Sequence, residues 1–494
     1  MRERATEGAD PRDTVGPAPS SGARVSVVGI GDDGWAGLGE RSREFVERAD
    51  IVVGAPRHLA LLPEGGAVHR AWPSPFTTAP IAELATRHRV CVLASGDPMF
   101  FGVGATLVRG LGADRVEVLP APSSTSLACA RLGWPAQDVP VISAVGRPLA
   151  ALAAELHSGA RLLVLSADGG TPGLAAALLC EHGFGASPIT VLEHLGGPAE
   201  STWHGTADAL TAVPERRFAD LNVIAVTCGP GPGLSRVPGR PDDTYAHDGQ
   251  LTKREIRALT LAALAPLPGE LLWDVGAGSG SVGIEWMRVH PACRAIGFEA
   301  RPERAERARA NADALGVPGL RLVVGQAPDT LDGDTPDAVF IGGGLTHEGV
   351  VERCWAALRP GGRLVANAVV AESEADLVRH RAVYGGELTR LQISRSSPVG
   401  RFTGWRPAMP VTQWVAVKPA EPAPTIAPPT APRPGPEPKP NPEPNPEPRP
   451  RPKSNPGPKP EPEPEPEPGL KAGPEPGPCS ASRIAAPAPP VEEQ

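Results

Sequence analysis

The stretch that most constrains the fold of this chain is LLWDVGAGSGSVGIE, at residues 271–285. Its apolar start, which ends in Asp274, is typical of a buried strand, and Gly276, Gly278 and Gly280 follow at once. Glycine adopts positive φ without a Cβ penalty, so the backbone here can turn tightly and approach a ligand closely. A helix is expected to follow the last glycine. The stretch therefore predicts a strand–turn–helix unit of a nucleotide-binding α/β sheet.

The spacing of these glycines distinguishes between two classes of ligand. A dinucleotide fingerprint needs G-x-G-x-x-G, but the sixth position counted from Gly276 is Ser281, and the pattern is D-x-G-x-G-x-G. That pattern resembles motif I of class I S-adenosylmethionine (SAM) methyltransferases. Such a ligand has no pyrophosphate, so a carboxylate at the strand end can meet its amino-acid part. The resemblance implies SAM contacts from Asp274, Gly276, Ala277, Gly278, Ser279 and Gly280.

A second acid supports this interpretation. Residues 294–299 (RAIGFE) are expected to form the next strand, and Glu299 ends it nineteen residues after Gly280. An acidic side chain at that point can accept hydrogen bonds from both ribose hydroxyls. After a third strand, Gln326 and Ala327 occupy the place where such enzymes bind adenine, and the Gln amide oxygen can accept a hydrogen bond.

The rest of this half predicts a twisted, mostly parallel sheet of the class I type, with helices between most strands. Strands are expected at residues 271–275, 294–298, 320–324, 337–341, 363–367 and 411–417. The last of them follows Pro410 and is a candidate for an antiparallel strand. The fourth ends in glycines 342–344, where enzymes that methylate amines usually carry a polar motif. Three glycines there favour a bulky planar substrate or a carbon nucleophile.

A helix is expected before this sheet, within HDGQLTKREIRALTLAAL at residues 247–264. Thr252 is predicted to be its N-cap, with Glu255 as the capping-box partner, and Thr252 is also counted among the SAM-binding residues. Glu285, on the helix after motif I, is expected to support the glycine loop. A proline- and glycine-rich stretch at residues 229–241 is the best domain boundary in the ordered part.

The N-terminal half starts with a glycine turn of another kind. A strand at about residues 25–28 runs into Gly29, Gly31 and Gly34, which satisfy G-x-G-x-x-G. The next strand, residues 51–53, ends in glycine and offers no acid to a ribose. The dinucleotide fingerprint is therefore incomplete.

Three further segments repeat a plan of strand, small turn and helix, at residues 90–104, 116–134 and 161–172. Turns at strand ends are where ligands bind in open α/β sheets. The first glycine turn, the Gly-Asp-Pro loop 96–98, the Pro-Ser-Ser turn 122–124 and residues 168–172 resemble elements of the tetrapyrrole (corrin/porphyrin) methylase family. That family holds SAM by backbone groups between two α/β subdomains. The resemblance implies SAM contacts from Gly29, Gly31, Gly96, Asp97, Ser123 and Ser124.

Two methyltransferase folds in one chain resemble the bifunctional, decarboxylating corrin-ring methyltransferases of cobalamin biosynthesis, over about residues 24–418. The resemblance implies that the N-terminal domain methylates carbon 5 of a precorrin-6 macrocycle. The C-terminal domain would methylate carbon 15 and remove carbon dioxide from the acetate on carbon 12, giving precorrin-8. Alternatives are a fusion of two methyltransferases with different small-molecule substrates, or a scaffold whose proline-rich tail recruits partners.

The substrate in this interpretation is a polyacidic ring, and the planar fork of arginine suits its carboxylates. The meso carbons of a reduced tetrapyrrole are already nucleophilic, so orientation and desolvation matter more than a strong base. We therefore name no catalytic acid or base from the sequence. Candidate carboxylate-binding residues are Arg254, Arg257, Arg395, Arg401, and Arg57 with His58.

About half of the 62 prolines follow Lys418, where apolar residues are too sparse to offset the entropy of ordering. That tail is expected to be disordered and polyproline-II-like. The predicted organisation is a disordered N-terminus (1–23), a tetrapyrrole methylase domain (24–228), a linker (229–246), a class I methyltransferase and decarboxylase domain (247–418) and a disordered tail (419–494).

The composition of the chain argues against several other classes of function. The seven cysteines are scattered, with no C-x-x-C and no His/Cys cluster, which predicts a reduced cytoplasmic protein without a bound metal. No apolar run is long enough to span a bilayer, so no membrane association is expected. The net charge of −8, with no basic stripe, argues against nucleic acid as a partner. The expected partners are the tetrapyrrole substrate and further copies of the chain.

Overall fold

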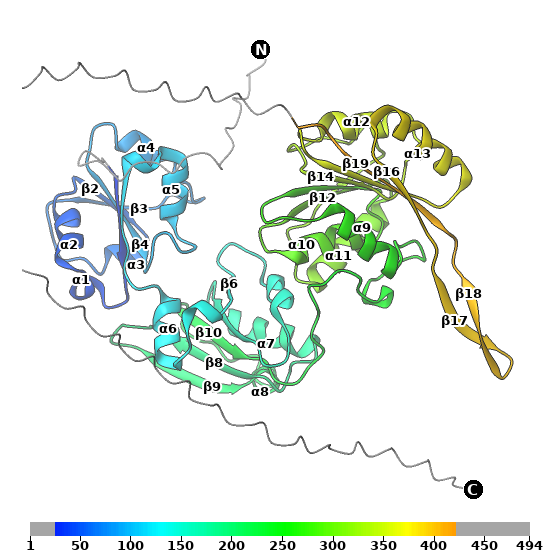
Figure 1. The fold of residues 1–494 in the computed structure, drawn as a ribbon. Helices are drawn as coiled ribbons and strands as arrows, with labels where there is room; N and C mark the ends of the chain where they lie inside the picture. Colours follow the sequence, from blue (N-terminus) through cyan, green and yellow to red (C-terminus); the bar gives the residue numbers. More distant parts are fainter. Residues whose placement is uncertain (1–24, 421–494) are drawn as a thin grey trace, which may run out of the picture. The chain divides into compact units, whose positions relative to one another are not determined.

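A computed structural model describes residues 25–420 of the chain (Figure 1). These residues form two five-stranded sheets, one seven-stranded sheet and a two-stranded hairpin. The predictions for the N-terminal segment 1–23 and for the proline-rich tail from residue 421 onward lie outside the described residues. Mixed α/β architecture with parallel-rich sheets confirms the predicted fold class.

The first sheet is entirely parallel, with the order β3-β2-β4-β1-β5. Val25 and Val27 of β1 pack into one apolar cluster, whereas Val28 and Ile30 pack into another. Burial on both faces explains why the strand is apolar throughout. The strands are β1 (Val25–Ile30), β2 (Ile51–Gly54), β3 (Val68–Ala71), β4 (Val90–Ser95) and β5 (Val116–Leu119). The helices are α1 (Gly34–Gly37), α2 (Glu40–Glu47), α3 (Pro56–Leu59), α4 (Ala79–Leu84) and α5 (Val103–Leu111).

The second sheet is mixed, with the order β6-β7-β10-β8-β9, and β6 and β7 are its parallel pair. Its strands are β6 (Val141–Ser143), β7 (Arg161–Leu165), β8 (Pro188–Glu193), β9 (Ser201–Thr206) and β10 (Asn222–Thr227). Its α-helices are α6 (Ser124–Leu132), α7 (Thr171–Glu181) and α8 (Ala207–Thr211). The turns after β4, β5 and β7 stand where the repeated strand–turn–helix plan predicted them.

The third sheet has the order β13-β12-β11-β14-β15-β19-β16, and its first five strands are parallel. β19 pairs antiparallel with β15, which confirms the interpretation of the segment after Pro410. Its strands are β11 (Leu271–Val275), β12 (Arg294–Glu299), β13 (Arg321–Val324), β14 (Ala338–Ile341), β15 (Arg363–Ala368), β16 (Glu387–Leu391) and β19 (Val411–Val417).

Helices cover both faces of this sheet. Successive residues of each strand point to opposite faces, so each strand packs against helices on both sides. Leu271 and Trp273 pack into an apolar cluster with residues of α12 and α13, whereas Leu272 packs with residues of α9, α10 and α11. The helices are α9 (Arg254–Leu264), α10 (Ser281–Val289), α11 (Pro302–Ala314), α12 (Val350–Ala357) and α13 (Ala371–Tyr384).

Three strands of this half were not predicted. β16 is an edge strand with no buried residue, and β17 (Ser394–Val399) and β18 (Phe402–Pro407) form an exposed hairpin. None of them has the apolar alternation of a half-buried strand, so the periodicity in the sequence could not reveal them.

The predicted N-cap of α9 was wrong. Helix α9 begins one residue later than expected, and its N-cap is Lys253, with no side-chain capping bond. The Thr252 carbonyl instead accepts a hydrogen bond from Arg257, and the Glu255 side chain pairs with Arg395. These tertiary contacts take the place of the predicted capping box.

Candidate functional site

A cavity of about 890 Å³ opens at the carboxyl ends of the central strands of the third sheet. The chain runs outward from β11 in one direction through β12 and β13, and in the other through β14 and β15. This reversal is the point at which open α/β sheets bind ligands. The lining includes these residues predicted from motif I and its neighbours: Thr252, Asp274, Gly276, Ala277, Gly278, Ser279, Glu299, Gln326 and Ala327.

The glycine turn after β11 requires glycine for two different reasons. Gly276 and Gly278 have φ of 73° and 58°, which side chains rarely adopt. A Cβ on Gly276 would lie 2.7 Å from the backbone of Gly343, so the turn touches the glycines after β14. A Cβ on Gly278 would meet nothing closer than the Gln250 carbonyl oxygen at 3.9 Å, which leaves the turn open toward the cavity.

Gly280, which was also predicted to contact SAM, is not among the residues that line the cavity. Its φ is 76°, and a Cβ there would lie 3.0 Å from the Cβ of Ala308. Its position next to Ala308 on α11 shows that this glycine permits close packing at the start of α10.

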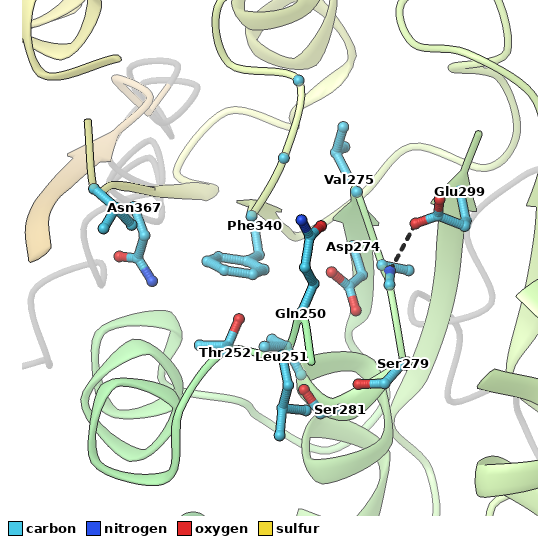
Figure 2. A pocket seen from close by; sticks show the side chains of 18 of the residues that line it. Gln250, Leu251, Thr252, Asp274, Val275, Ser279, Ser281, Glu299, Phe340 and Asn367 are labelled. Atoms are coloured by element: carbon cyan, nitrogen blue, oxygen red, sulfur yellow. Dashed lines mark hydrogen bonds between the residues drawn. The ribbon is translucent and has the colours of Figure 1, made fainter. Parts of the chain in front are cut away.

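Glu299 faces the glycine turn from the end of β12 (Figure 2). Its Oε2 accepts a hydrogen bond from Gly278 N at 2.8 Å, and its Oε1 accepts one from Arg301 N at 3.0 Å. Each carboxylate oxygen has more than one acceptor position, so both can still accept from a ligand. The residue is buried yet lines the cavity, and this geometry suits a pair of ribose hydroxyls.

Asp274 is buried at the end of β11, and its Oδ2 accepts a hydrogen bond from Gly283 N at 2.9 Å. Burial above all, partly offset by the bond from Gly283 N and helped by the charge of Glu299, raises the pKa of this carboxyl to about 7. Nearby, the buried Ser279 hydroxyl has no hydrogen-bond partner among the described residues. Buried polar groups are normally paired, so Ser279 can bind a polar group of a ligand.

The cavity is also lined by residues that the sequence analysis did not name. They include Gln250, Lys253, His347, Asn367 and Met409, and the predicted glycines 342–344 line the cavity as well. Asn367 could have been found, because it stands near the carboxyl end of the predicted strand 363–367. His347 and Met409 lie in segments that no motif marks, whereas Lys253 lies within the stretch 247–264, next to the predicted N-cap.

The arginine candidates divide into three groups. Arg395 lines the cavity and pairs with Glu255. Arg254 and Arg401 are exposed residues outside the lining, and the Arg401 guanidinium lies over the Phe402 ring. Arg257 is fully buried and binds Glu285, so its prediction as a substrate ligand was wrong.

The expectation for Glu285 was also wrong. Its carboxylate accepts hydrogen bonds from Gly239 N, Arg240 N, the Tyr245 hydroxyl and Arg257 Nε, and none from the glycine loop. The start of α10 is instead held by Asp274, as described above. Glu285 thus attaches the segment before α9 to the third sheet's helices.

In the first sheet the predicted turns converge. A Cβ on Gly29 would lie 2.0 Å from the Gly96 carbonyl oxygen and 2.6 Å from Ala121 N, so three loops meet there. Gly96 N donates to the Ile30 carbonyl oxygen at 3.0 Å, and Ala121 N donates to the Gly96 carbonyl oxygen at 3.3 Å. The turns at the carboxyl ends of β1, β4 and β5 therefore form one surface, in which Gly29 and Gly96 are themselves buried.

The polar side chains of these turns are used locally. Asp97 Oδ1 accepts from Met99 N at 2.9 Å, and Ser123 Oγ caps α6 by accepting from Ser126 N at 3.0 Å. Ser124 is the first residue of α6, and a Cβ on Gly31 would meet the Asp33 carboxylate at 2.5 Å. Contacts to a ligand from these loops would come chiefly from their backbone.

A polar cluster adjoins this surface at the end of β4. Arg57 Nη2 donates to Ser95 Oγ at 2.6 Å, and His58 Nε2 lies 3.1 Å from the same oxygen. Burial, followed by the Arg57 charge, lowers the pKa of His58 to about 4, so the imidazole is neutral near pH 7. Arg57 is therefore the cation of the pair, and it remains a candidate for binding a carboxylate.

Within residues 25–420, no group of three or more His, Cys, Asp or Glu side chains is arranged to hold a metal ion. The helices of this part of the chain include none that is long and apolar enough to cross a bilayer.

Both halves of the chain match known families. Residues 24–211 match the family model of tetrapyrrole (corrin/porphyrin) methylases, and residues 243–418 match that of the precorrin methyltransferase domain. The precorrin-6Y C(5,15)-methyltransferase (decarboxylating) of Sinorhizobium sp. is 49% identical over 397 residues, which cover 79% of this chain and 95% of the relative. The protein of that name from Mycobacterium tuberculosis (strain CDC 1551 / Oshkosh) is 47% identical, with coverage of 80% and 100%.

Solved structures match parts of the chain. The C-terminal domain of precorrin-6Y C5,15-methyltransferase from Rhodobacter capsulatus is 49% identical, covering 37% of this chain and 100% of its own, with a TM-score of 0.36. A precorrin-6Y methylase from Archaeoglobus fulgidus is 27% identical, covering 41% of this chain and 97% of its own, with a TM-score of 0.32.

Proposed function

The chain belongs to the precorrin-6Y C(5,15)-methyltransferase (decarboxylating) family, and on this premise we propose how its two halves divide the reaction. The enzyme methylates a precorrin-6 macrocycle at carbons 5 and 15 with SAM and removes carbon dioxide, a step of cobalamin biosynthesis. The N-terminal domain methylates carbon 5. The C-terminal domain methylates carbon 15 and decarboxylates the acetate on carbon 12, which gives precorrin-8.

The observation that carries the proposal for the C-terminal domain is the lining of its cavity. The lining combines the glycine turn, Glu299 and the Ser279 hydroxyl, which has no partner among the described residues, with glycines 342–344 and the side chains of Lys253 and Arg395. SAM, when bound, supplies an electrophilic methyl group on its sulfonium sulfur. Glu299 would bind the ribose, Gln326 and Ala327 would contact the adenine, and Asp274 would meet the amino-acid part.

The proposed substrate is a carbon nucleophile, and its methylation does not need a dedicated base. The meso carbon is nucleophilic already, so the chain has to align it with the methyl group and exclude water. Glycines 342–344 leave room for a flat ring at the end of β14. Lys253 and Arg395 place positive charge in the lining, where carboxylates of the ring can reach it.

For the N-terminal domain, we propose that SAM is held by the three converging turns, through Gly29, Gly31, Gly96, Asp97, Ser123 and Ser124. Their side chains are absent or used locally, which leaves backbone groups for the ligand. Arg57, held by Ser95, is proposed to bind a substrate carboxylate.

The test is to incubate the purified full chain with SAM and precorrin-6B and to record the mass of the product. We expect a gain of two methyl groups and a loss of one carbon dioxide. A product with one methyl group, or with all its carboxylates, would contradict the proposed function. The alternative of two unrelated activities is disfavoured because the relative from Mycobacterium tuberculosis is matched over 100% of its length by this chain.

We further propose that the chain forms a homo-oligomer through the β17–β18 hairpin. Phe402 and Trp405 on the hairpin are 67% and 76% exposed, and a two-stranded hairpin is marginally stable by itself. Burying these rings against a second copy would stabilise it. Light scattering after size-exclusion chromatography tests this: Trp405→Asp should yield a smaller species, and an unchanged mass would contradict the interface.

The cytoplasm is the proposed location, because the six described cysteines are all free thiols, as expected in a reducing compartment. Nucleic acid is proposed not to be a partner, in line with the net charge of −8. Filter binding to duplex DNA at low salt would test this, and retention of DNA would contradict it.

A further inference from the structure

Asn367, near the carboxyl end of β15, lines the C-terminal cavity. We propose that its side-chain amide orients the substrate carboxylate that leaves as carbon dioxide, an inference that rests on the proposed function and extends it. Figure 2 shows Asn367 on the other side of Phe340 from Asp274 and Glu299, so it lies away from the acids that are proposed to bind SAM.

Two neighbours fix the orientation of the Asn367 amide. Thr260 Oγ1 donates to the Ile256 carbonyl oxygen of its own helix at 2.8 Å, so this oxygen can only accept other hydrogen bonds. It accepts from Asn367 Nδ2 at 2.9 Å and from Gln413 Nε2 at 3.3 Å. Gln413 Nε2 also donates to Asn367 Oδ1 at 3.1 Å. The amide nitrogen of Asn367 must therefore face Thr260.

The network leaves one N–H of Asn367 unused. An amide nitrogen carries two hydrogens, and Thr260 accepts one of them. Thr260 and Gln413 are buried, whereas Asn367 is partly exposed in the cavity lining. Gln413 stands directly opposite Asn367 in the antiparallel pair of β19 and β15, so the register of the two strands keeps the two side chains together. The second N–H is a preorganised donor for a ligand in the cavity.

Asn367 is a neutral donor, whereas some other polar groups in the lining are cations. This difference indicates which carboxylate of the substrate each of them would bind. Lys253 and Arg395, whose side chains are 48% and 50% exposed, also line the cavity. They lie beside Asp242 and Glu255, and their remaining N–H groups can pair with carboxylates that are retained. An ion pair stabilises the carboxylate before reaction, and decarboxylation removes that charge. Pairing with a cation would thus raise the barrier, whereas a neutral donor orients the group with less ground-state stabilisation. Asn367 is accordingly assigned to the departing carboxylate.

The step requires no oxidant or reductant. The bond between the side-chain methylene and the carboxylate carbon breaks, and its electron pair passes into the conjugated imine system of the ring. Carbon dioxide leaves, and a proton from water completes the new methyl group. Asn367 neither takes nor gives a proton in this step, because it acts by orientation alone.

The test compares Asn367→Leu with the wild-type full chain, using SAM and precorrin-6B and following product mass over time. Loss of a hydrogen bond to a charged group should slow carbon dioxide release by about 10- to 100-fold. Methyl transfer should slow much less, so a methylated product that retains all its carboxylates accumulates. Asn367→Gln, which keeps a neutral amide, should restore part of the release rate.

Thr412→Val is the matched control, since Thr412 is next to Gln413 on β19 and its hydroxyl binds Glu374 rather than the cavity. Its product mixture should equal that of the wild type. Equal slowing of both steps in Asn367→Leu would indicate a purely structural role and overturn the inference, as would unchanged carbon dioxide release. A wild-type chain that releases no carbon dioxide would instead overturn the proposed function.

Discussion

The Arg257 guanidinium donates through Nε to the Glu285 carboxylate across 2.7 Å, and the two side chains are only 0% and 1% exposed. The pair joins α9, which contributes to the cavity, to α10, which follows the glycine turn. The same carboxylate binds the Tyr245 hydroxyl at 2.8 Å. One buried ion pair therefore joins two of the elements that build the C-terminal site.

Replacement of Glu285 by Ala should destabilise the C-terminal domain by about 3–5 kcal/mol, because the Arg257 charge would stay buried without its partner. Urea unfolding followed by tryptophan fluorescence measures this. The double variant Arg257→Met, Glu285→Leu is the control, since it removes both charges and should lose less stability. A single variant that is no less stable than the double variant would contradict the explanation.

Asp274→Ala combined with Gly278→Val should abolish methylation at carbon 15 and decarboxylation. The valine places a branched side chain at φ 58° in the turn and projects it into the cavity. SAM binding by the N-terminal domain should survive, so calorimetry should count two SAM sites per wild-type chain and one per variant. Wild-type carbon-15 activity in this variant would refute the assignment of the cavity.

The raised pKa of Asp274, about 7 in the folded chain against 3.8 for an ordinary Asp carboxyl, predicts a pH effect on stability. Between pH 4 and 7 the unfolded chain loses this proton while the folded chain keeps it. The free energy of unfolding therefore falls as pH rises through this window, by up to about 4 kcal/mol from this group. The gain in stability of Asp274→Asn over the wild type should grow from pH 5 to pH 8 in urea titrations, and a constant difference would contradict the raised pKa.

Deletion of residues 419–494 should leave both methylations and the decarboxylation intact in vitro. The segment consists largely of Pro-Glu and related repeats, with too few apolar residues to build part of a site. Steady-state rates of the truncated and full chains should agree within about twofold, a difference of less than 0.5 kcal/mol in activation free energy. Loss of activity would favour the scaffold hypothesis.

Much of the fold could be predicted because it is encoded locally. The apolar run before Asp274, the glycine turn and Glu299 belong to consecutive strand ends, and parallel strands bring such ends to one edge of a sheet. Residues 271–275 and 411–417 were predicted with the bounds observed for β11 and β19. The exposed strand β16 and the β17–β18 hairpin were missed, because an exposed strand carries no apolar alternation.

The sequence by itself determined most strands of the third sheet and the glycine turn that borders its cavity, since strand burial and glycine conformation are local properties. Only the tertiary structure decided the roles of individual polar side chains. Arg257 and Arg395 were equally good candidates from the sequence, yet Arg257 is buried against Glu285 and Arg395 lines the cavity. Asn367 acquires its orientation from Thr260 and Gln413, which are distant in the chain. The partners of a polar group come from long-range packing, and no local pattern records them.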